Sequence, residues 1–151
     1  MVREALSVFA LVGTGVVAGV MFAVAISVVP ALLRMTPEVY VQTHKLLGRH
    51  YDRVMPFVVV GSAVAELLLV LDSGTTWRRA WFIAGAVLML GVAVVSQTGN
   101  VPINRRVKAL PAGDVPDDWD DPRGAWRHWH RLRTGFALCA LAVTATGVVT
   151  P

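Results

Sequence analysis

The run from Leu6 to Val29 contains no charged residue and exceeds the about 20 residues that a helix needs to cross the hydrocarbon of a bilayer. It continues into Pro30 and Arg34 without the small-residue cleavage motif of a secretory signal, so we expect a retained transmembrane helix. Three shorter apolar runs follow, and the last is long enough only if its helix begins near Arg123. We therefore predict a single all-α membrane-embedded domain over residues 1–151, with four transmembrane helices at about 6–29, 56–71, 80–97 and 131–149.

The composition indicates that the lipid bilayer is the main partner of the chain. Hydrophobic residues make up 55% of it, above the about 45–50% of soluble domains, and the mean hydropathy is +0.58. A net charge of +4 would also suit nucleic acid, but the basic residues flank apolar runs instead of forming one basic face. Nucleic-acid binding is therefore not expected, and the single cysteine, Cys139, excludes an intramolecular disulfide.

The basic residues also predict an orientation. All of the 14 Lys and Arg residues except Arg3, Arg78 and Arg79 lie within residues 34–54 and 100–133. By the positive-inside rule, both long connections then lie in the cytoplasm and both termini outside. The expected location is the plasma membrane of a bacterium.

The connection after the first helix predicts a short interfacial helix. Thr36 and Pro37 form a helix start, and the helix would end near Tyr51, before a turn at Met55-Pro56. Tyr40, His44 and Tyr51 share one stripe of this amphipathic segment. His44 is either a packed interfacial histidine or a base or ligand aimed into the bundle.

The segment from Asn100 to Thr134 is the only long polar stretch, and we expect it to form a polar cap between the third and fourth helices. On a helix that begins near Arg123, one face of about 100° combines two indoles, an imidazole and a guanidinium. One interpretation is an aromatic and arginine belt at the headgroup level; the other is a site. The residues of this face are Trp126, Trp129, His130 and Arg133.

Two asparagines lie opposite that face. Asn100 and Asn104 are four residues apart, so they share a helical face or line a tight turn around Pro102. Amides at the end of a membrane helix usually need buried partners, which favours the site interpretation.

The sequence contains no motif for nucleotide, haem or iron–sulfur binding, so no organic cofactor is predicted. All four histidines lie on the same predicted side of the membrane. A copper or iron ion held by one histidine from each connection is a minority alternative; those histidines are His44, His50, His128 and His130.

Glu66 interrupts the second apolar run. An ionisable residue inside a membrane span is costly enough to be a functional candidate that faces the bundle. It also lies only about 8 Å from the end of the run at Leu71, so the alternative is that it reaches the interface.

Four motifs, in this order and spacing, resemble a family of small four-helix membrane proteins that includes the fungal anthrone oxygenases. They cover most of the chain: Val29-Pro30-Ala31-Leu32, His44, Asn100-Val101-Pro102-Ile103-Asn104 and Trp129-His130-Arg131-Leu132-Arg133-Thr134. The resemblance implies a membrane oxygenase that converts an anthrone-like or phenolic lipophilic aromatic with O2, as in polyketide pathways, without flavin, haem or nicotinamide.

Under this resemblance, a histidine acts as general base and cationic or amide groups hold the enolate oxygen that forms. The expected catalytic residues are His44, His130, Arg133, Asn100 and Asn104, with the base either His44 or His130. Four aromatic residues are expected to bind the substrate: Trp126, Trp129, Tyr40 and Tyr51. The alternative function is a non-catalytic transporter or accessory subunit with Glu66 as its ion- or proton-sensitive group.

The topology also makes a geometric prediction. Both polar connections pack over the same opening of the bundle, so His44 must converge with His130 and Arg133 on one cavity there. We expect its apolar walls to be Phe22, Ile26 and Met55.

Overall fold

The computed structural model describes residues 1–111, 115–116 and 118–150, and every regular element in these ranges is helical. The long helices are α1 (Val2–Ala23), α3 (Pro37–Asp72), α4 (Thr76–Val95) and α6 (Arg123–Val149). Two shorter helices, α2 (Val29–Leu32) and α5 (Val101–Ala109), extend α1 and α4 through π-helical turns η1 (Val24–Val28) and η2 (Ser96–Asn100). The chain thus forms four rods: α1–η1–α2, α3, α4–η2–α5 and α6.

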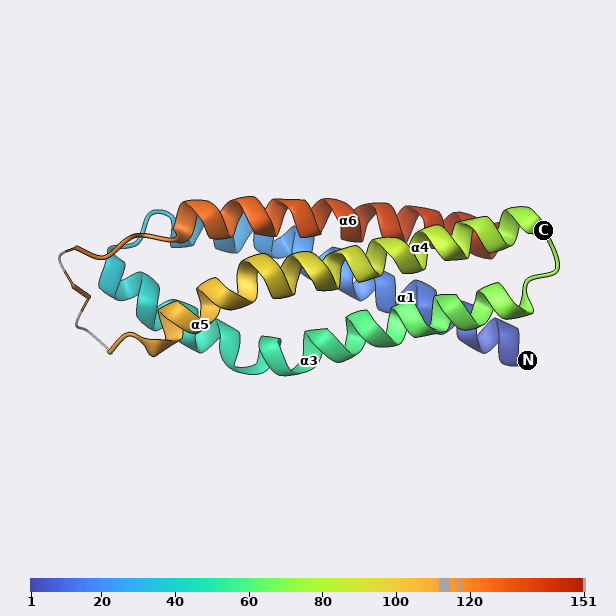
Figure 1. Ribbon diagram of the computed structural model, residues 1–151, viewed down its shortest axis with the longest axis horizontal. Coiled ribbons are helices and arrows are strands. Elements are labelled where there is room, and N and C mark those ends of the chain that lie inside the picture. The colour runs from blue at the N-terminus through green and yellow to red at the C-terminus, as the bar shows by residue number, and fades with distance from the viewer. Residues whose placement is uncertain (112–114, 117, 151) are drawn as a thin grey trace.

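The rods run up and down in chain order (Figure 1). α1 packs against α3 and α6, and α4 packs against the same two helices, so the four rods close into a ring. Both termini lie at one end, called here the terminal end. The opposite end, which carries the connections at 33–36 and 110–122, is called the cap end. The predicted cap includes residues 112–114 and 117, which lie outside the described residues.

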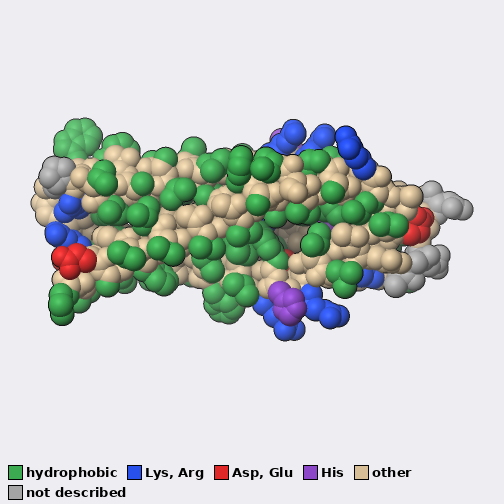
Figure 2. Space-filling view, turned by 180° about the vertical axis from the view of Figure 1, so that it is seen from behind, with side chains coloured by type: hydrophobic (Ala, Val, Ile, Leu, Met, Phe, Trp, Pro, Cys, Tyr) green, Lys and Arg blue, Asp and Glu red, His purple; other side chains and the backbone are tan. Residues whose placement is uncertain are grey.

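All four rods are long and apolar enough to cross a membrane, with 31, 36, 34 and 27 residues. Large hydrophobic side chains are exposed along their outer faces, for example Phe57 at 79% and Phe9 at 57%. Figure 2 shows hydrophobic side chains over the middle of the molecule, between basic groups at the terminal end and a second basic zone toward the cap. The chain is therefore an integral membrane protein, and its outer surface is a lipid contact.

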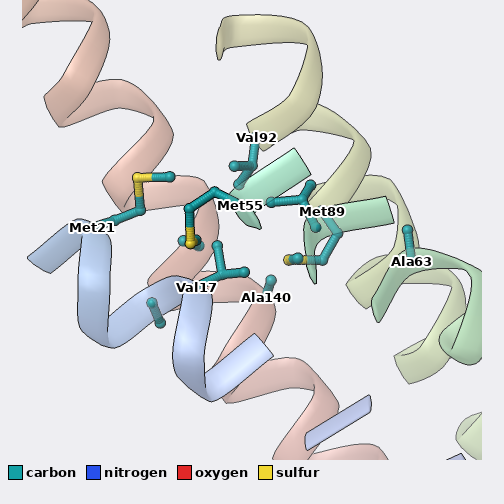
Figure 3. Packing of buried hydrophobic residues seen from close by; sticks show 10 residues of the cluster. Val17, Met21, Met55, Ala63, Met89, Val92 and Ala140 are labelled. Carbon is teal, nitrogen blue, oxygen red and sulfur yellow. The ribbon is translucent and has the colours of Figure 1, made fainter. Parts of the chain in front are cut away.

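The core in the middle of the bundle is packed from all four rods. Met21 of α1, Met55 of α3 and Met89 of α4 point toward one another beside small residues of α6 (Figure 3). Unbranched thioether side chains fill irregular space between helices, and Ala140 lets α6 approach closely. This packing fixes the rods below the cap end.

The first and third rods pass a proline without breaking. A proline lacks the N–H that the carbonyl four residues earlier would accept, so a helix must adjust around it. Here η1 directly precedes the α2 turn that contains Pro30, and η2 directly precedes the α5 turn that contains Pro102. The wider π turns absorb the missing bond, which is why the third helix continues to Ala109 instead of ending near residue 97.

The predicted interfacial helix is wrong as a separate element. α3 runs without interruption from Pro37 to Asp72 and contains Pro56 inside it, so no turn forms at Met55-Pro56. One proline removes a single backbone bond, and packing along a 36-residue helix outweighs that loss. α3 is therefore about 54 Å long at 1.5 Å per residue, about 24 Å more than the hydrocarbon thickness, so the cap end extends beyond the hydrocarbon.

Candidate active site

Polar groups from all four rods meet toward the cap end. α3 carries His44, the third rod carries Asn104, and α6 carries His130 and Arg133, while the first rod contributes the backbone carbonyl of Met21. His44 and Arg133 are each 6% exposed and His130 is fully buried. Buried polar groups require hydrogen-bond partners, and contacts between the rods supply them.

The imidazole of His130 is bonded at both ring nitrogens. Arg133 donates from Nε and Nη2 to Nδ1 of His130, at 3.1 and 3.0 Å. A guanidinium has no acceptor, so Nδ1 accepts and the ring proton is on Nε2, which donates to the carbonyl oxygen of Met21 at 3.0 Å. His130 is therefore held neutral and has no lone pair left for a substrate proton.

Arg133 is a buried cation without a carboxylate partner in the described ranges. Its Nη1 donates to Oγ of Ser96 at 3.3 Å, and none of the ion pairs found there includes it. A buried charge is costly unless it is paired. Arg133 thus provides a buried positive charge inside the bundle, and a bound anion can neutralise it.

The tautomer of His44 is set by a neighbouring indole. Nε1 of Trp126, which can only donate, donates to Oδ1 of Asn104 at 2.9 Å and so fixes the orientation of that amide. The same oxygen lies 3.1 Å from Nε2 of His44, so Nε2 carries the ring proton and donates. The lone pair of His44 is consequently on Nδ1, and this histidine retains a basic nitrogen.

Aromatic rings connect the two histidines. The Trp126 ring stacks on His130 with centroids 5.2 Å apart and an angle of 5° between the planes. It meets His44 edge-on at 5.8 Å, and Tyr40 lies 5.3 Å from His44 on the other side along α3. The hydroxyl of Tyr40 is buried and has no hydrogen-bond partner among the described residues. These rings hold the imidazoles in place.

Two cavities open beside these groups. The larger, of about 370 Å³, lies between α3 and the α4–η2–α5 rod, and the smaller, of about 110 Å³, lies between α3 and the α1–η1–α2 rod. His44 and Trp126 line the smaller one. The residues that line both are Tyr51, Asp52, Asn104 and Arg133. The cavities therefore meet at a wall that carries a guanidinium, an amide, a carboxylate and a phenol.

The predicted convergence on one cavity is confirmed for His44 and Arg133, which both line the smaller cavity, but not for His130, which lines neither. The predicted apolar walls are wrong in part. Met55 lines the larger cavity, but Phe22 is 47% exposed and Ile26 61% exposed, so both side chains face outward. Met21 supplies the wall from α1 instead. Counting residues along a helix gives the depth of a residue in the membrane, but it does not give the side of the helix on which its side chain lies.

The other predicted site residues, Asn100, His130, Tyr40 and Trp129, line neither cavity; the first three are buried and Trp129 is half-buried. Asn100 is fully buried, donates from Nδ2 to the carbonyl oxygen of Trp126 at 3.2 Å, and leaves Oδ1 without a partner in the described ranges. Trp129 packs against Gly99, where an added Cβ would lie 2.4 Å from the indole ring. Burial of Trp126, His130 and Arg133 excludes the belt interpretation for these three residues.

Among the lining residues that were not predicted are Ser96, Asp52 and Lys108. Ser96 receives the Arg133 hydrogen bond, and its position four residues before Asn100 is a sequence signal that was available. Asp52 and Lys108 form an ion pair at 2.5 Å that ties α3 to α5. Asp52 and Lys108 are 56 residues apart and lie on different helices, so no sequence pattern predicts that they pair.

Arg123 closes the cap end. It donates from Nη1 to the carbonyl oxygens of Leu32 and Met35, at 3.1 and 2.6 Å, and its guanidinium lies 5.2 Å from the centre of the Tyr40 ring. It also pairs with Asp121, and its hydrogen bonds hold the pKa of that carboxyl below the usual range. These contacts join the first rod to the start of α6, above the cavities.

A histidine-bound metal fits these residues poorly. A copper or iron ion held by His44 and His130 needs a free lone pair on each ring. The single lone pair of His130, on Nδ1, already accepts from Arg133, and its Nε2–H donates to the carbonyl oxygen of Met21. No group of three or more His, Cys, Asp or Glu side chains that could hold a metal occurs in the described part of the chain.

Glu66 lines neither cavity, although Val60, six residues away on α3, lines the larger one. It is fully buried, so the interpretation that it reaches the interface is wrong. Its Oε1 accepts from Oγ1 of Thr144 of α6, its Oε2 has no partner among the described residues, and Gly85 of α4 packs against the carboxyl group. The twenty-two positions from His44 to Glu66 correspond to about 33 Å along α3. Glu66 is therefore not part of the cavity site.

Comparison with known proteins gives one match. Residues 44–143 match the family model described as anthrone oxygenase. No curated protein and no solved structure matches the chain. The matched range begins at His44 and includes Asn104, His130 and Arg133.

Proposed function

We propose, because the chain belongs to the anthrone oxygenase family, that it is a membrane-embedded oxygenase that oxidises a lipophilic aromatic, anthrone-like or phenolic substrate with dioxygen and without an organic cofactor. The observation that carries this proposal is that a histidine with a basic nitrogen and an unpaired arginine line the same cavity. Proton removal and anion stabilisation both require such groups.

The first step is removal of a proton. An anthrone is a flat apolar ketone whose doubly benzylic carbon becomes electron-rich when it loses a proton. Nδ1 of His44 accepts that proton, while the C–H electron pair moves into the ring system and the negative charge collects on the ketone oxygen. The neutral substrate thus becomes an enolate.

The enolate oxygen is held by groups that donate to it. Arg133 supplies a fixed positive charge, and Asn104 has both hydrogens of its amide nitrogen left because its oxygen accepts from His44 and Trp126. Both residues line the two cavities. Donors placed in advance in a water-poor site stabilise a developing oxyanion strongly, by about 2.7–4 kcal/mol for a single donor.

Dioxygen completes the reaction. The electron-rich carbon forms a C–O bond with O2, the O2 is reduced to a peroxide, and the proton on His44 returns to give a hydroperoxide. Loss of the second hydrogen of that carbon with cleavage of the O–O bond releases water and leaves the quinone carbonyl. One O2 is consumed per substrate, and no other reductant is needed.

The test of this function is oxygen consumption by the purified protein with emodin anthrone, together with the absorbance of the anthraquinone formed. We expect His44→Gln to lower kcat by at least about 100-fold, the usual contribution of a general base. His50→Gln is the matched control, because His50 is exposed on the same helix. Full activity of His44→Gln, or no turnover by the unmodified protein, would contradict the proposal.

A second function is favoured by the buried Glu66, one of whose oxygens has no partner among the described residues. It is a transporter or accessory subunit in which this carboxyl group binds a proton or cation. Under this alternative, Glu66→Gln abolishes pH-dependent flux in proteoliposomes and His44→Gln leaves it unchanged. Oxygenase activity retained in Glu66→Gln, with no flux by the unmodified protein, removes the alternative.

A further inference from the structure

The larger cavity is apolar at one end and cationic at the other. Along α3 its wall is formed by Tyr51, Asp52 and four apolar side chains, of which Pro56 and Val60 are exposed at the outer surface. Along α5 it is formed by Val101, Asn104 and the two cations Arg105 and Lys108. The cavity is therefore open to the lipid-facing side of α3 and has the shape of a site for an amphiphile.

The charges of this lining do not cancel. Its cations are Arg105, Lys108 and Arg133, and its only carboxylate is Asp52, which pairs with Lys108. Neither Arg105 nor Arg133 takes part in an ion pair within the described ranges. Two guanidinium groups from different rods thus remain to interact with an anionic ligand.

The polarity of the cavity follows that of a membrane leaflet. About 20 helical residues cross the hydrocarbon. Counted from the basic residue Arg78 near the start of α4, they reach residue 98, so Arg105 and Lys108 lie at or beyond headgroup depth. Counted back from Asp72 at the end of α3, they reach residue 52, so Pro56 and Val60 lie within the hydrocarbon. An amphiphile in the leaflet would enter the cavity without turning over.

Figure 2 shows the face of the bundle that is hidden in Figure 1. Basic side chains gather at both edges at a similar distance from the cap end, and a recess lies between them. Basic side chains therefore lie at both edges of this face toward the cap end.

We infer that the larger cavity binds an amphiphile whose acidic group lies at Arg105, beside the Lys108–Asp52 ion pair, and whose apolar body lies along Pro56 and Val60. This inference rests on the proposed oxygenase function. It makes the substrate a lipophilic aromatic that carries a carboxylate, with its reacting carbonyl toward Arg133, at the wall shared with the smaller cavity that His44 lines. The phosphate of an anionic lipid has the same recognition chemistry, so the experiment separates these two sources.

The test compares two non-reactive ligands, anthraquinone-2-carboxylic acid and its methyl ester, on the whole protein in phosphatidylcholine nanodiscs. Their dissociation constants are measured by quenching of tryptophan fluorescence. We expect the acid to bind about tenfold more tightly than the ester, a difference of about 1.4 kcal/mol. Arg105→Gln should reduce this ratio to about one. Arg106→Gln, which removes an exposed cation from α5 that lines neither cavity, should preserve it.

Equal binding of acid and ester by the unmodified protein, or an unchanged ratio in Arg105→Gln, overturns the inference. Competition with phosphatidic acid identifies the source of the anion. If phosphatidic acid displaces the ester in an Arg105-dependent way while the acid shows no preference, the cavity binds a lipid phosphate and the substrate assignment is wrong. Emodin anthrone has no carboxyl group, so turnover of this substrate by the unmodified protein tests the proposed function separately.

Discussion

The indole of Trp126 determines the chemistry of a residue on another helix. Because Nε1 of Trp126 donates to Oδ1 of Asn104, the amide cannot rotate by half a turn without losing that bond, and His44 must donate to the same oxygen. The free lone pair on Nδ1 of His44 therefore depends on Trp126, which makes no hydrogen bond to Nδ1. A substitution that removes only the indole N–H of Trp126 separates its hydrogen bond to Asn104 from its ring contacts with the two histidines.

We predict that Trp126→Phe lowers kcat with emodin anthrone by about 10- to 100-fold and changes KM little. The ring remains to contact both histidines, but the amide is free to turn and His44 loses its fixed tautomer. Steady-state kinetics on the purified protein check this split. Trp77→Phe is the control, because Trp77 is 74% exposed at the terminal end. An unchanged kcat in Trp126→Phe would show that the tautomer is held by other contacts.

We predict that Arg133→Lys lowers kcat/KM by about 100-fold or more, although the charge is retained. A guanidinium is a planar fork that donates to His130 and Ser96 together, and a lysine ammonium on a flexible stem does not reproduce that geometry. Arg131→Lys, at an exposed position of the same helix, should be neutral. Activity equal to the unmodified protein would mean that charge alone is sufficient.

Residue identities in the site were predictable, but their roles were only partly so. The motifs in the two polar connections identified both histidines as candidate bases. What separates them is the set of partners that other helices supply: a carbonyl and a guanidinium for His130, an amide for His44. A sequence pattern within one helix carries no information about these partners.

At the scale of elements, the π turns position the site. η1 begins three residues after Met21, whose carbonyl oxygen accepts from His130. η2 begins at Ser96, which accepts from Arg133, and ends at Asn100, which donates to the backbone of Trp126. A π turn inserts one extra residue and so rotates the following helix by about 100° relative to an unbroken α-helix. The two prolines that follow these turns therefore determine which side chains face the cavities.

Close packing of η2 against α6 gives a stability prediction. Gly99→Ala should lower the stability of the protein by about 1–3 kcal/mol, because the new Cβ would lie 2.4 Å from the rigid Trp129 ring. Gly135→Ala is the control within α6, where no atom lies within 4 Å of an added Cβ, and should be neutral or stabilising by about 0.5–1 kcal/mol. Thermal unfolding in detergent measures both. Equal midpoints for the two variants would contradict the packing argument.

The helices themselves were predictable because apolar runs of membrane length permit few alternatives. Their ends were not, because prolines were treated as stops. Pro56 and Pro102 lie inside continuing rods, where contacts with neighbouring helices compensate for one lost backbone bond. The start of α6 at Arg123 followed from a simple length requirement and is confirmed.

For the whole molecule, the distribution of basic residues predicts a topology that can be measured. In a Cys139→Ser background, Gly74→Cys places a thiol in the turn between α3 and α4, and Arg106→Cys places one near the cap end. A membrane-impermeant maleimide should label Gly74→Cys in intact cells, whereas Arg106→Cys should require lysed cells. The reverse pattern would place the cap end and its cavities outside the cytoplasm.

The unpaired charge of Arg133 has a consequence for turnover. A neutral ketone gains little from a fixed cation, its enolate gains much, and the neutral quinone that follows again gains little. The affinity of the site is then low for the neutral substrate, high for the enolate and low again for the neutral quinone. The protein would hold the intermediate tightly and release the product without a conformational change. An acidic substituent bound at Arg105 keeps its charge throughout, so such a product would leave more slowly than an uncharged one.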